Sequence, residues 1–178
     1  MKYVAFLRAV NVSGSNRISM EELQKVFLET GFANIKTYLQ SGNVVFETQE
    51  SSITVLQDTL ETAISQKLGL EVKVLVFSKD EFEKIIQGNE FLSRGLSPDF
   101  LHVTLLKEPH GPGLSIKAQD RKSPTEQILL AGRFLYLHCP EGYGKTKLSN
   151  TSLEKWAGSV GTTRNWKTIM AVNQLLQE

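Results

Sequence analysis

Residues 3–14 read Tyr-Val-Ala-Phe-Leu-Arg-Ala-Val-Asn-Val-Ser-Gly, and this stretch decides the fold. Its first five residues are apolar without alternation, which is typical of a central strand covered on both faces rather than of an edge strand. The residues that follow, 8–17, are mostly small, polar or cationic, and no acid precedes Glu21. A strand that leads into a basic loop rich in Gly and Asn often presents a ligand-binding edge. The stretch therefore predicts a buried central strand with a binding loop at its end.

The composition is that of an ordinary soluble globular protein. The chain has 178 residues, of which 40% are hydrophobic and 22% charged, and its formal net charge is +1. This length suffices to bury a core in one large domain or two small ones, and the net charge indicates no preference for nucleic acid or membranes. The single cysteine, Cys139, excludes an internal disulfide and a multi-cysteine metal site. Because no apolar run approaches the roughly 18 residues of a spanning helix, and the N-terminus lacks the plan of a signal peptide, we expect a cytoplasmic protein.

Charge is distributed unevenly along the chain. Residues 1–20 carry three cations and no acid, residues 143–170 carry five cations and one acid, and residues 21–110 carry an excess of acids. If the two ends meet in space, they form one positive face. The alternative is an uneven scatter of solvated charges without functional meaning.

The first part of the chain predicts an α+β unit. Periodicity and turn signals indicate a strand at 3–7, a helix between Ser19 and Gly31, strands near 35–39 and 44–48, a helix over 52–68 and a strand at 72–77. Ser19 and Glu22 have the spacing of a capping box, and Gly42 or Asn43 can take the positive φ of a tight hairpin. The order βαββαβ is the ferredoxin-like (split βαβ) plan. Its antiparallel sheet, in order 4-1-3-2, places the first strand inside.

The second part of the chain predicts a related but incomplete unit. The expected elements are a helix from Ser78 to Gly88, a strand at 100–107, a short helix at 114–118, a hairpin of strands 126–131 and 133–139, a helix over 151–158, and a last helix from Thr162 or Thr163 onward. From residue 100 the order is β-α-β-β-α-α, close to a second ferredoxin-like unit without its last strand. The predicted division is into residues 1–78 and a second α+β half at 79–178.

Several common sites do not fit the sequence. The Gly-rich segment 141–146 is no P-loop, because Cys139 stands where the first Gly is required; its N–H groups could still hold an anion, and a solvated loop is the alternative. Too few spaced aromatics are present for an RNA-recognition sheet. His102, His110 and His138 lack paired spacing, so no metal site is predicted. His138 and Cys139 face opposite sides of a strand and cannot pair as base and nucleophile, which leaves the question of catalysis open.

Residues 162–168, Thr-Thr-Arg-Asn-Trp-Lys-Thr, form the most unusual polar stretch. We expect a threonine to cap the last helix, with Arg164, Asn165 and Lys167 in its first turn. Cations there oppose the helix dipole, and a sequence that breaks a local rule often marks a site. Arginine and lysine beside free N–H groups would suit a phosphate or carboxylate. The alternative is that Arg164 pairs with a carboxylate at a domain interface.

Four ordered motifs resemble the bacterial domain-of-unknown-function family 1697 (DUF1697). They are Y-x-A-x-L-R-x-x-N-V-x-G at 3–14, T-Y-x-Q-S-G-N-V at 37–44, K-L-x-N at 147–150 and T-R-N-W-x-T at 163–168. Lys167 departs from the Asn that is typical of the family, and Lys145-Thr146 departs from its usual Arg/Lys-Ser. The resemblance spans nearly the whole chain and implies a pair of ferredoxin-like α+β halves. It implies no established activity, substrate or cofactor.

The motif residues suggest a shared site between the two halves. Arginines would grip an anion and asparagines would orient it. The candidate residues are Arg8, Asn11, Ser41, Gly42, Asn43, Lys147, Asn150, Arg164 and Asn165. The favoured ligand is an anionic small molecule, such as a nucleotide or a phosphorylated metabolite. The alternatives are single-stranded nucleic acid along the same face, or a non-catalytic structural or interaction module whose motifs lock the halves together. No cofactor is predicted, and no oligomeric state follows.

Overall fold

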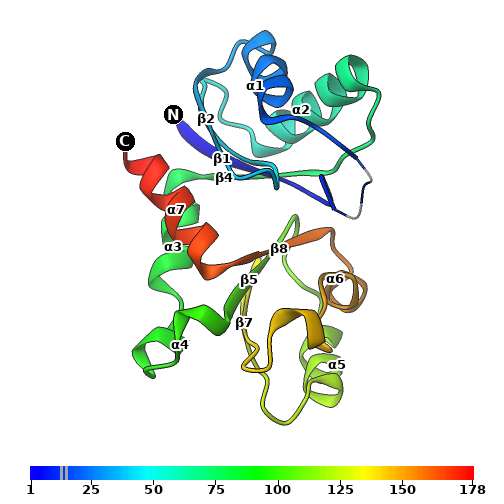
Figure 1. Cartoon of the computed structure of the whole chain (residues 1–178), viewed down its shortest axis with the longest axis vertical. Helices are drawn as coiled ribbons and strands as arrows, with labels where there is room; N and C mark the ends of the chain where they lie inside the picture. The colour runs from blue at the N-terminus through cyan, green and yellow to red at the C-terminus, as the bar shows by residue number, and fades with distance from the viewer. Residues whose placement is uncertain (13, 15) are drawn as a thin grey trace. The chain divides into compact units, whose positions relative to one another are not determined.

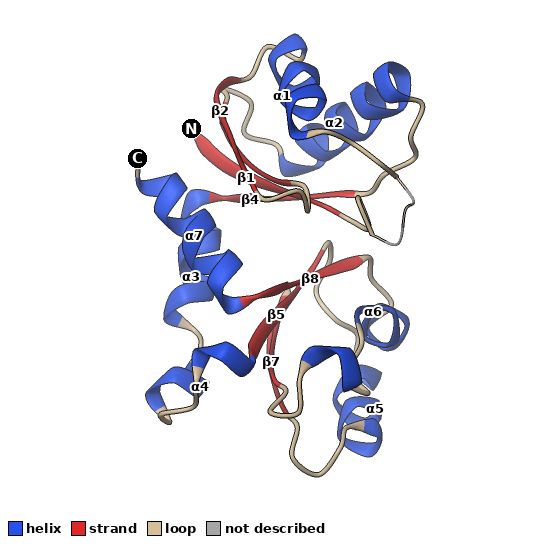
Figure 2. Ribbon diagram, in the orientation of Figure 1, coloured by secondary structure: helices blue, strands red, loops and turns tan. Residues whose placement is uncertain are grey.

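The computed structural model describes residues 1–12, 14 and 16–178, so Ser13 and Ser15 of the loop after the first strand lie outside the described residues. The fold is mixed α+β with two four-stranded antiparallel sheets (Figures 1 and 2). The chain divides into two compact units. Unit 1 comprises Met1–Glu83 with Ala171–Glu178, and unit 2 comprises Lys84–Met170. Helices α3 (Lys79–Gln87) and α7 (Trp166–Gln177) each contribute residues to both units.

The first sheet belongs to unit 1 and has the order β2-β3-β1-β4, which confirms the predicted strand order. Its elements are β1 (Lys2–Leu7), α1 (Met20–Glu29), β2 (Ala33–Tyr38), β3 (Asn43–Glu47), α2 (Ile53–Leu68) and β4 (Val74–Ser78). Helices α1 and α2 cover one face of this sheet (Figure 2). Residues 3–7 are all buried, because Tyr3, Ala5 and Leu7 pack toward these helices, while Phe6 stacks on Phe82 of α3 with 5.7 Å between ring centroids. The side chains of this unbroken apolar run therefore pack on both faces of β1.

Local signals set the ends of the helices in unit 1 as predicted. The Ser19 hydroxyl accepts from the Glu22 N–H at 3.1 Å, and the Glu22 carboxylate accepts from the Ser19 N–H at 3.1 Å, which completes the capping box. Gly31 follows α1 with φ +86°, and the Phe32 N–H donates to the Phe27 carbonyl. These short-range bonds satisfy backbone groups that a helix end would otherwise leave without partners.

Unit 2 repeats the same order of strands and long helices. Its elements are α4 (Glu90–Ser93), a 3₁₀ turn (Pro98–Phe100), β5 (Leu101–Leu106), α5 (Gly113–Arg121), β6 (Gln127–Ala131), β7 (Phe134–His138), a 3₁₀ turn (Tyr143–Lys145), α6 (Asn150–Ala157) and β8 (Gly161–Asn165). The sheet order is β6-β7-β5-β8. Helices α5 and α6 pack on one face through Leu114, Ala118, Leu153 and Ala157. The prediction that this half lacks its last strand is wrong, because β8 occupies that place.

Strand β8 replaces the expected first turn of the last helix. It pairs antiparallel with β5, with Thr163 opposite Thr104 and Arg164 opposite Val103. Two consecutive β-branched threonines favour this extended conformation, and pairing satisfies the edge of β5. Helix α7 begins only at Trp166, where the Asn165 side chain accepts from the Thr168 N–H at 2.8 Å. Asn165, not Thr162 or Thr163, is therefore the helix cap, and Arg164 is a strand residue.

Among the described residues, no helix combines the length and the hydrophobicity that crossing a membrane requires.

Candidate functional site

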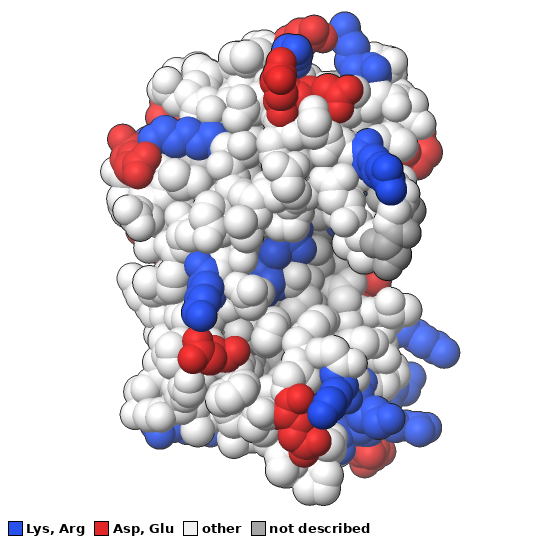
Figure 3. Space-filling view, viewed as in Figure 1, with Lys and Arg blue, Asp and Glu red and all other residues white. Residues whose placement is uncertain are grey.

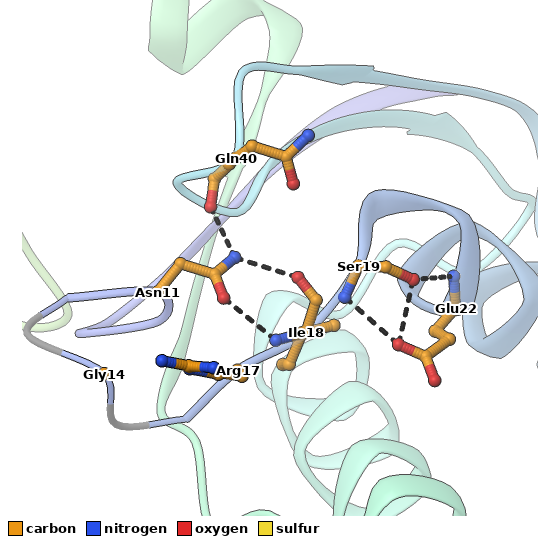
Figure 4. Close-up of a pocket in the computed structure, with 7 residues that line it drawn as sticks. All are labelled: Asn11, Gly14, Arg17, Ile18, Ser19, Glu22 and Gln40. Carbon is orange, nitrogen blue, oxygen red and sulfur yellow. Dashed lines mark hydrogen bonds between the residues drawn. The ribbon is translucent and has the colours of Figure 1, made fainter.

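Asn11 fastens the loop after β1 to the turn between β2 and β3. Its amide nitrogen donates to the carbonyls of Ile18 at 2.8 Å and Gln40 at 2.6 Å, and its amide oxygen accepts from the Ile18 N–H at 2.9 Å (Figure 4). The backbone of Asn11 has φ +55°, a left-handed conformation that asparagine tolerates better than most residues. Asn11 thus uses both ends of its amide to shape the loop.

The turn before β3 holds the other predicted residues of unit 1. Gly42 has φ +69°, and its carbonyl accepts from the Leu7 N–H at 2.8 Å. The buried Asn43 amide donates to the Tyr38 carbonyl at 2.8 Å and to the Ser41 hydroxyl at 2.9 Å. The register of the sheet sets Asn43 opposite Phe6. The end of β1 therefore lies beside the start of β3.

Arg8 follows β1 directly and is half-buried. Its backbone N–H donates to the Lys73 carbonyl at 2.9 Å, next to β4. Arg8, Asn11 and Gly42 therefore lie at the same end of the first sheet, where the β1 exit meets the β2–β3 turn.

A cavity of about 470 Å³ lies beside this loop. Figure 4 shows its lining residues, which are Asn11, Gly14, Arg17, Ile18, Ser19, Glu22 and Gln40. Arg17 is exposed and has no ion-pair partner among the described residues. Hydrogen bonds from Ser19 lower the pKa of Glu22, so this carboxylate stays ionised at neutral pH. Arg17 and Gln40 were not among the predicted site residues, although Arg17 is a cation of the loop after β1 and Gln40 belongs to the motif at 37–44.

In unit 2, Asn150 joins the start of α6 to strand β8. Its amide nitrogen donates to the Gly161 carbonyl at 3.0 Å, and its amide oxygen accepts from the Thr163 hydroxyl at 3.0 Å. Its backbone N–H donates to the Tyr143 hydroxyl at 3.1 Å. Thr163 lies 2.7 Å from the Thr104 hydroxyl across the sheet. Asn150 is therefore part of a bonded polar network on the helix-covered face.

Arg164 points to the opposite face of the sheet, because adjacent strand residues alternate. Its Nη1 donates to the Thr162 hydroxyl at 2.6 Å and to the Thr163 carbonyl at 3.0 Å. The side chain is half-buried, and desolvation lowers the pKa of its guanidinium to about 10, with Tyr143 acting in the opposite direction. The group remains cationic at neutral pH, although its environment disfavours the charge.

Asn165 and Lys147 are the remaining predicted residues of unit 2. Asn165 caps α7, and the neighbouring Lys167 forms an ion pair with Asp99 at 3.1 Å. Lys147 is exposed in the loop before α6, where it lines a groove together with residues of α5 and α6. The cap of α6 is Ser149, two residues before the start of the helix predicted over 151–158.

The described residues contain no group of three His, Cys, Asp or Glu side chains that could hold a metal ion. His102 instead stacks on Tyr143, with ring centroids 4.6 Å apart and an interplanar angle of 21°. His138 lies near Phe91 and Phe100. Burial lowers the pKa of both histidines, so each ring is neutral in the folded state at neutral pH.

The lowered pKa of His102 predicts a loss of stability on acidification. In the unfolded chain a histidine titrates near 6.5, whereas the folded state resists protonation. The free energy of unfolding is therefore unaffected by His102 protonation above about pH 6.5. It declines as the pH falls through that value, because the unfolded state then binds more protons than the folded state. We expect the urea midpoint of the wild type to fall more steeply between about pH 7.5 and 5.5 than that of His102→Phe, which keeps a stacking ring. Parallel profiles would show that His102 does not contribute.

Comparison with known proteins identifies a family. The family model "protein of unknown function (DUF1697)" matches residues 1–136. The chain belongs to the DUF1697 family. A conserved bacterial protein from Streptococcus pneumoniae has a similar structure, with 22% sequence identity, a TM-score of 0.73 and coverage of 98% of each chain. No curated protein matches the sequence. The DUF1697 chain therefore shares its fold with this bacterial protein over nearly its whole length.

Proposed function

We propose that this DUF1697 protein binds an anionic small molecule, a nucleotide or a phosphorylated metabolite, and that Arg164 contacts the anion. The observation that carries the proposal is the half-buried, desolvated guanidinium on β8, held against the strand by Thr162 and Thr163. A guanidinium presents donors in a planar fork that matches phosphate and carboxylate oxygens. Its orientation by neighbouring oxygens reduces the entropy that binding would cost.

Electrostatics supports an anion at this position. Desolvation is the largest influence on the pKa of Arg164 and lowers it to about 10. Because burial disfavours the charged form of this guanidinium, a bound anion would offset part of the cost of burying the charge.

In this proposal the asparagines do not orient the anion, as first expected, but position the backbone. The side-chain amides of Asn11, Asn43, Asn150 and Asn165 bond to atoms of the chain itself. We assign them to the positioning of loops and of β8. Arginine then supplies the contact with the ligand.

The test is calorimetric titration of the wild type and Arg164→Gln with nucleotides and sugar phosphates. A ligand present at 100 times its dissociation constant stabilises the folded state by about 2.7 kcal/mol, so thermal shifts identify candidates for titration. We expect Arg164→Gln to weaken binding of such a ligand at least about tenfold, since a hydrogen bond between charged groups contributes about 1.5–3 kcal/mol.

The matched control is Arg94→Gln, which removes the same charge from an exposed arginine that pairs with Glu90 at 2.9 Å. This variant should bind as the wild type does. Equal affinity of wild type and Arg164→Gln for every ligand that binds would refute the role of Arg164. If no ligand stabilises the wild type and Arg164→Gln is only less stable, the protein is instead a structural module.

We also propose that both units are ferredoxin-like. Support comes from the order βαββαβ, which recurs as β1-α1-β2-β3-α2-β4 and β5-α5-β6-β7-α6-β8, and from the matching strand orders of the two sheets.

A further inference from the structure

A groove of about 610 Å³ lies between α5 and α6 in unit 2. It is lined by the end of α5, the loop before α6, and α6 itself, through Asp120, Arg121, Lys147, Ser152, Lys155 and Trp156. Figure 3 shows basic side chains gathered on the part of the surface over these two helices, with acidic ones beside them. With three cations and one acid, the lining of the groove has a net positive charge.

The three cations of this groove have no ion-pair partner among the described residues. The side chains of Arg121, Lys147 and Lys155 form no hydrogen bond or ion pair with any described residue, and the side chain of Asp120, in the same groove, is also unpaired. Cations elsewhere do pair with carboxylates, as in Lys25–Glu21, Lys67–Glu29, Lys73–Glu61, Lys79–Glu83, Arg94–Glu90 and Lys167–Asp99. The positive charge of the groove is therefore not neutralised within the described chain and is open to a polyanion.

Trp156 adds an aromatic surface to this charge. The side chain is half-buried, because it packs against the core beneath α5 and α6, and it also lines the groove. Its indole N–H has no hydrogen-bond partner among the described residues. A ring anchored on a core and flanked by cations is a platform on which a nucleic-acid base can stack.

We propose that this groove binds single-stranded nucleic acid, with the three cations on the phosphates and a base on Trp156. Proteins that bind single strands without sequence preference combine a cationic groove with an aromatic ring on which a base stacks. A site for a polyanion without bases would need the cations but not the ring. The proposal goes beyond the anion site, because Arg164 points to the face of the second sheet that α6 does not cover. Arg164→Gln should leave this binding unchanged.

The salt dependence of affinity tests the cations. Fluorescence anisotropy would follow binding of a labelled oligothymidylate or oligouridylate of about 12 nucleotides, a length within the site sizes of such proteins. Three phosphate contacts predict that affinity falls roughly 20-fold between about 50 and 200 mM salt. Arg121→Gln with Lys155→Gln leaves one contact, so the fall should shrink to about threefold.

The control for charge is Lys25→Gln with Lys67→Gln, which removes the same two charges from helices of unit 1. We expect this variant to keep the wild-type affinity and salt dependence. If both double variants lose affinity equally, net charge rather than the groove governs binding, and the proposal is wrong.

Trp156→Leu tests the stacking platform, since leucine retains apolar packing against the core. With the fold verified by circular dichroism, we expect affinity to fall at least about fivefold without a change in salt dependence, and fluorescence quenching by the oligonucleotide to disappear. Competition with inorganic polyphosphate separates the two contributions. Equal binding of polyphosphate and oligonucleotide by wild type and Trp156→Leu would overturn the assignment to nucleic acid, as would failure of wild type to bind either oligonucleotide.

Discussion

Gly42→Ala is expected to destabilise the protein by about 3 kcal/mol, by combining a strained backbone with overpacking. Gly42 has φ +69°, and a Cβ at this position would lie 2.7 Å from the Leu7 Cβ and 2.8 Å from the Val10 Cγ2. Leu7 is a core residue of the central strand β1, so it cannot retreat without disturbing the sheet. The change in the free energy of unfolding is measured by urea denaturation.

Gly69→Ala is the matched control for backbone strain. Gly69 has φ +66°, but a Cβ there would have no neighbour within 4 Å. Its expected cost is therefore only the left-handed conformation, about 1 kcal/mol. The difference between the two variants measures the close approach of the β2–β3 turn to β1. Equal effects would mean that this approach does not constrain the turn.

Asn11→Asp is expected to cost about 3 kcal/mol near pH 7, because it removes two hydrogen bonds and adds repulsion. A carboxylate oxygen would replace the Nδ2 that now lies 2.6 Å from the Gln40 carbonyl oxygen and 2.8 Å from that of Ile18. These contacts disfavour the ionised form, so the folded-state pKa of the new carboxyl should rise above its unfolded value of about 3.9. The cost relative to wild type should then shrink as the pH falls through the raised pKa, because the protonated group regains one donor. The urea midpoints of the wild type and Asn11→Asp, compared near pH 7 and near pH 4, measure this change in the cost.

Asn16→Asp provides the comparison within the same loop. Asn16 also has a positive φ, at +47°, but its amide donates a single longer bond, 3.3 Å to the Ala9 carbonyl. We expect a cost below about 1 kcal/mol. If the two substitutions are equally costly, Asn11 is not the residue that fastens the loop to the β2–β3 turn.

Features that depend on neighbouring residues in the chain were predictable from sequence. The capping box of Ser19 and Glu22, the helix end at Gly31 and the positive φ of Gly42 follow from hydrogen bonds and sterics within a few residues. The central position of β1 also follows, because a strand with five consecutive apolar residues must be covered on both faces. These signals were enough to predict the strand order of the first sheet.

The candidate site was predictable only in part. Asn11, Gly42, Asn150 and Arg164 were predicted as ligand-binding residues, yet the amides of Asn11 and Asn150 form hydrogen bonds to other groups of the chain. Asparagine in a polar motif looks the same in sequence whether its amide meets a ligand or a carbonyl. Arg121 and Trp156 were missed, because they lie on different helices and meet only when α5 packs against α6.

By itself, then, the sequence determined the α+β class, the central strand and most helix ends, since each depends on local propensity and periodicity. Only the tertiary structure determined the secondary structure of residues 161–165. Their threonines are compatible with a helix cap. The edge of β5, however, offers backbone hydrogen-bond partners to an extended segment and not to the start of a helix, so these residues form a strand. That pairing moves Arg164 from a helix terminus to a sheet face, because long-range hydrogen bonding outweighs a weak local preference.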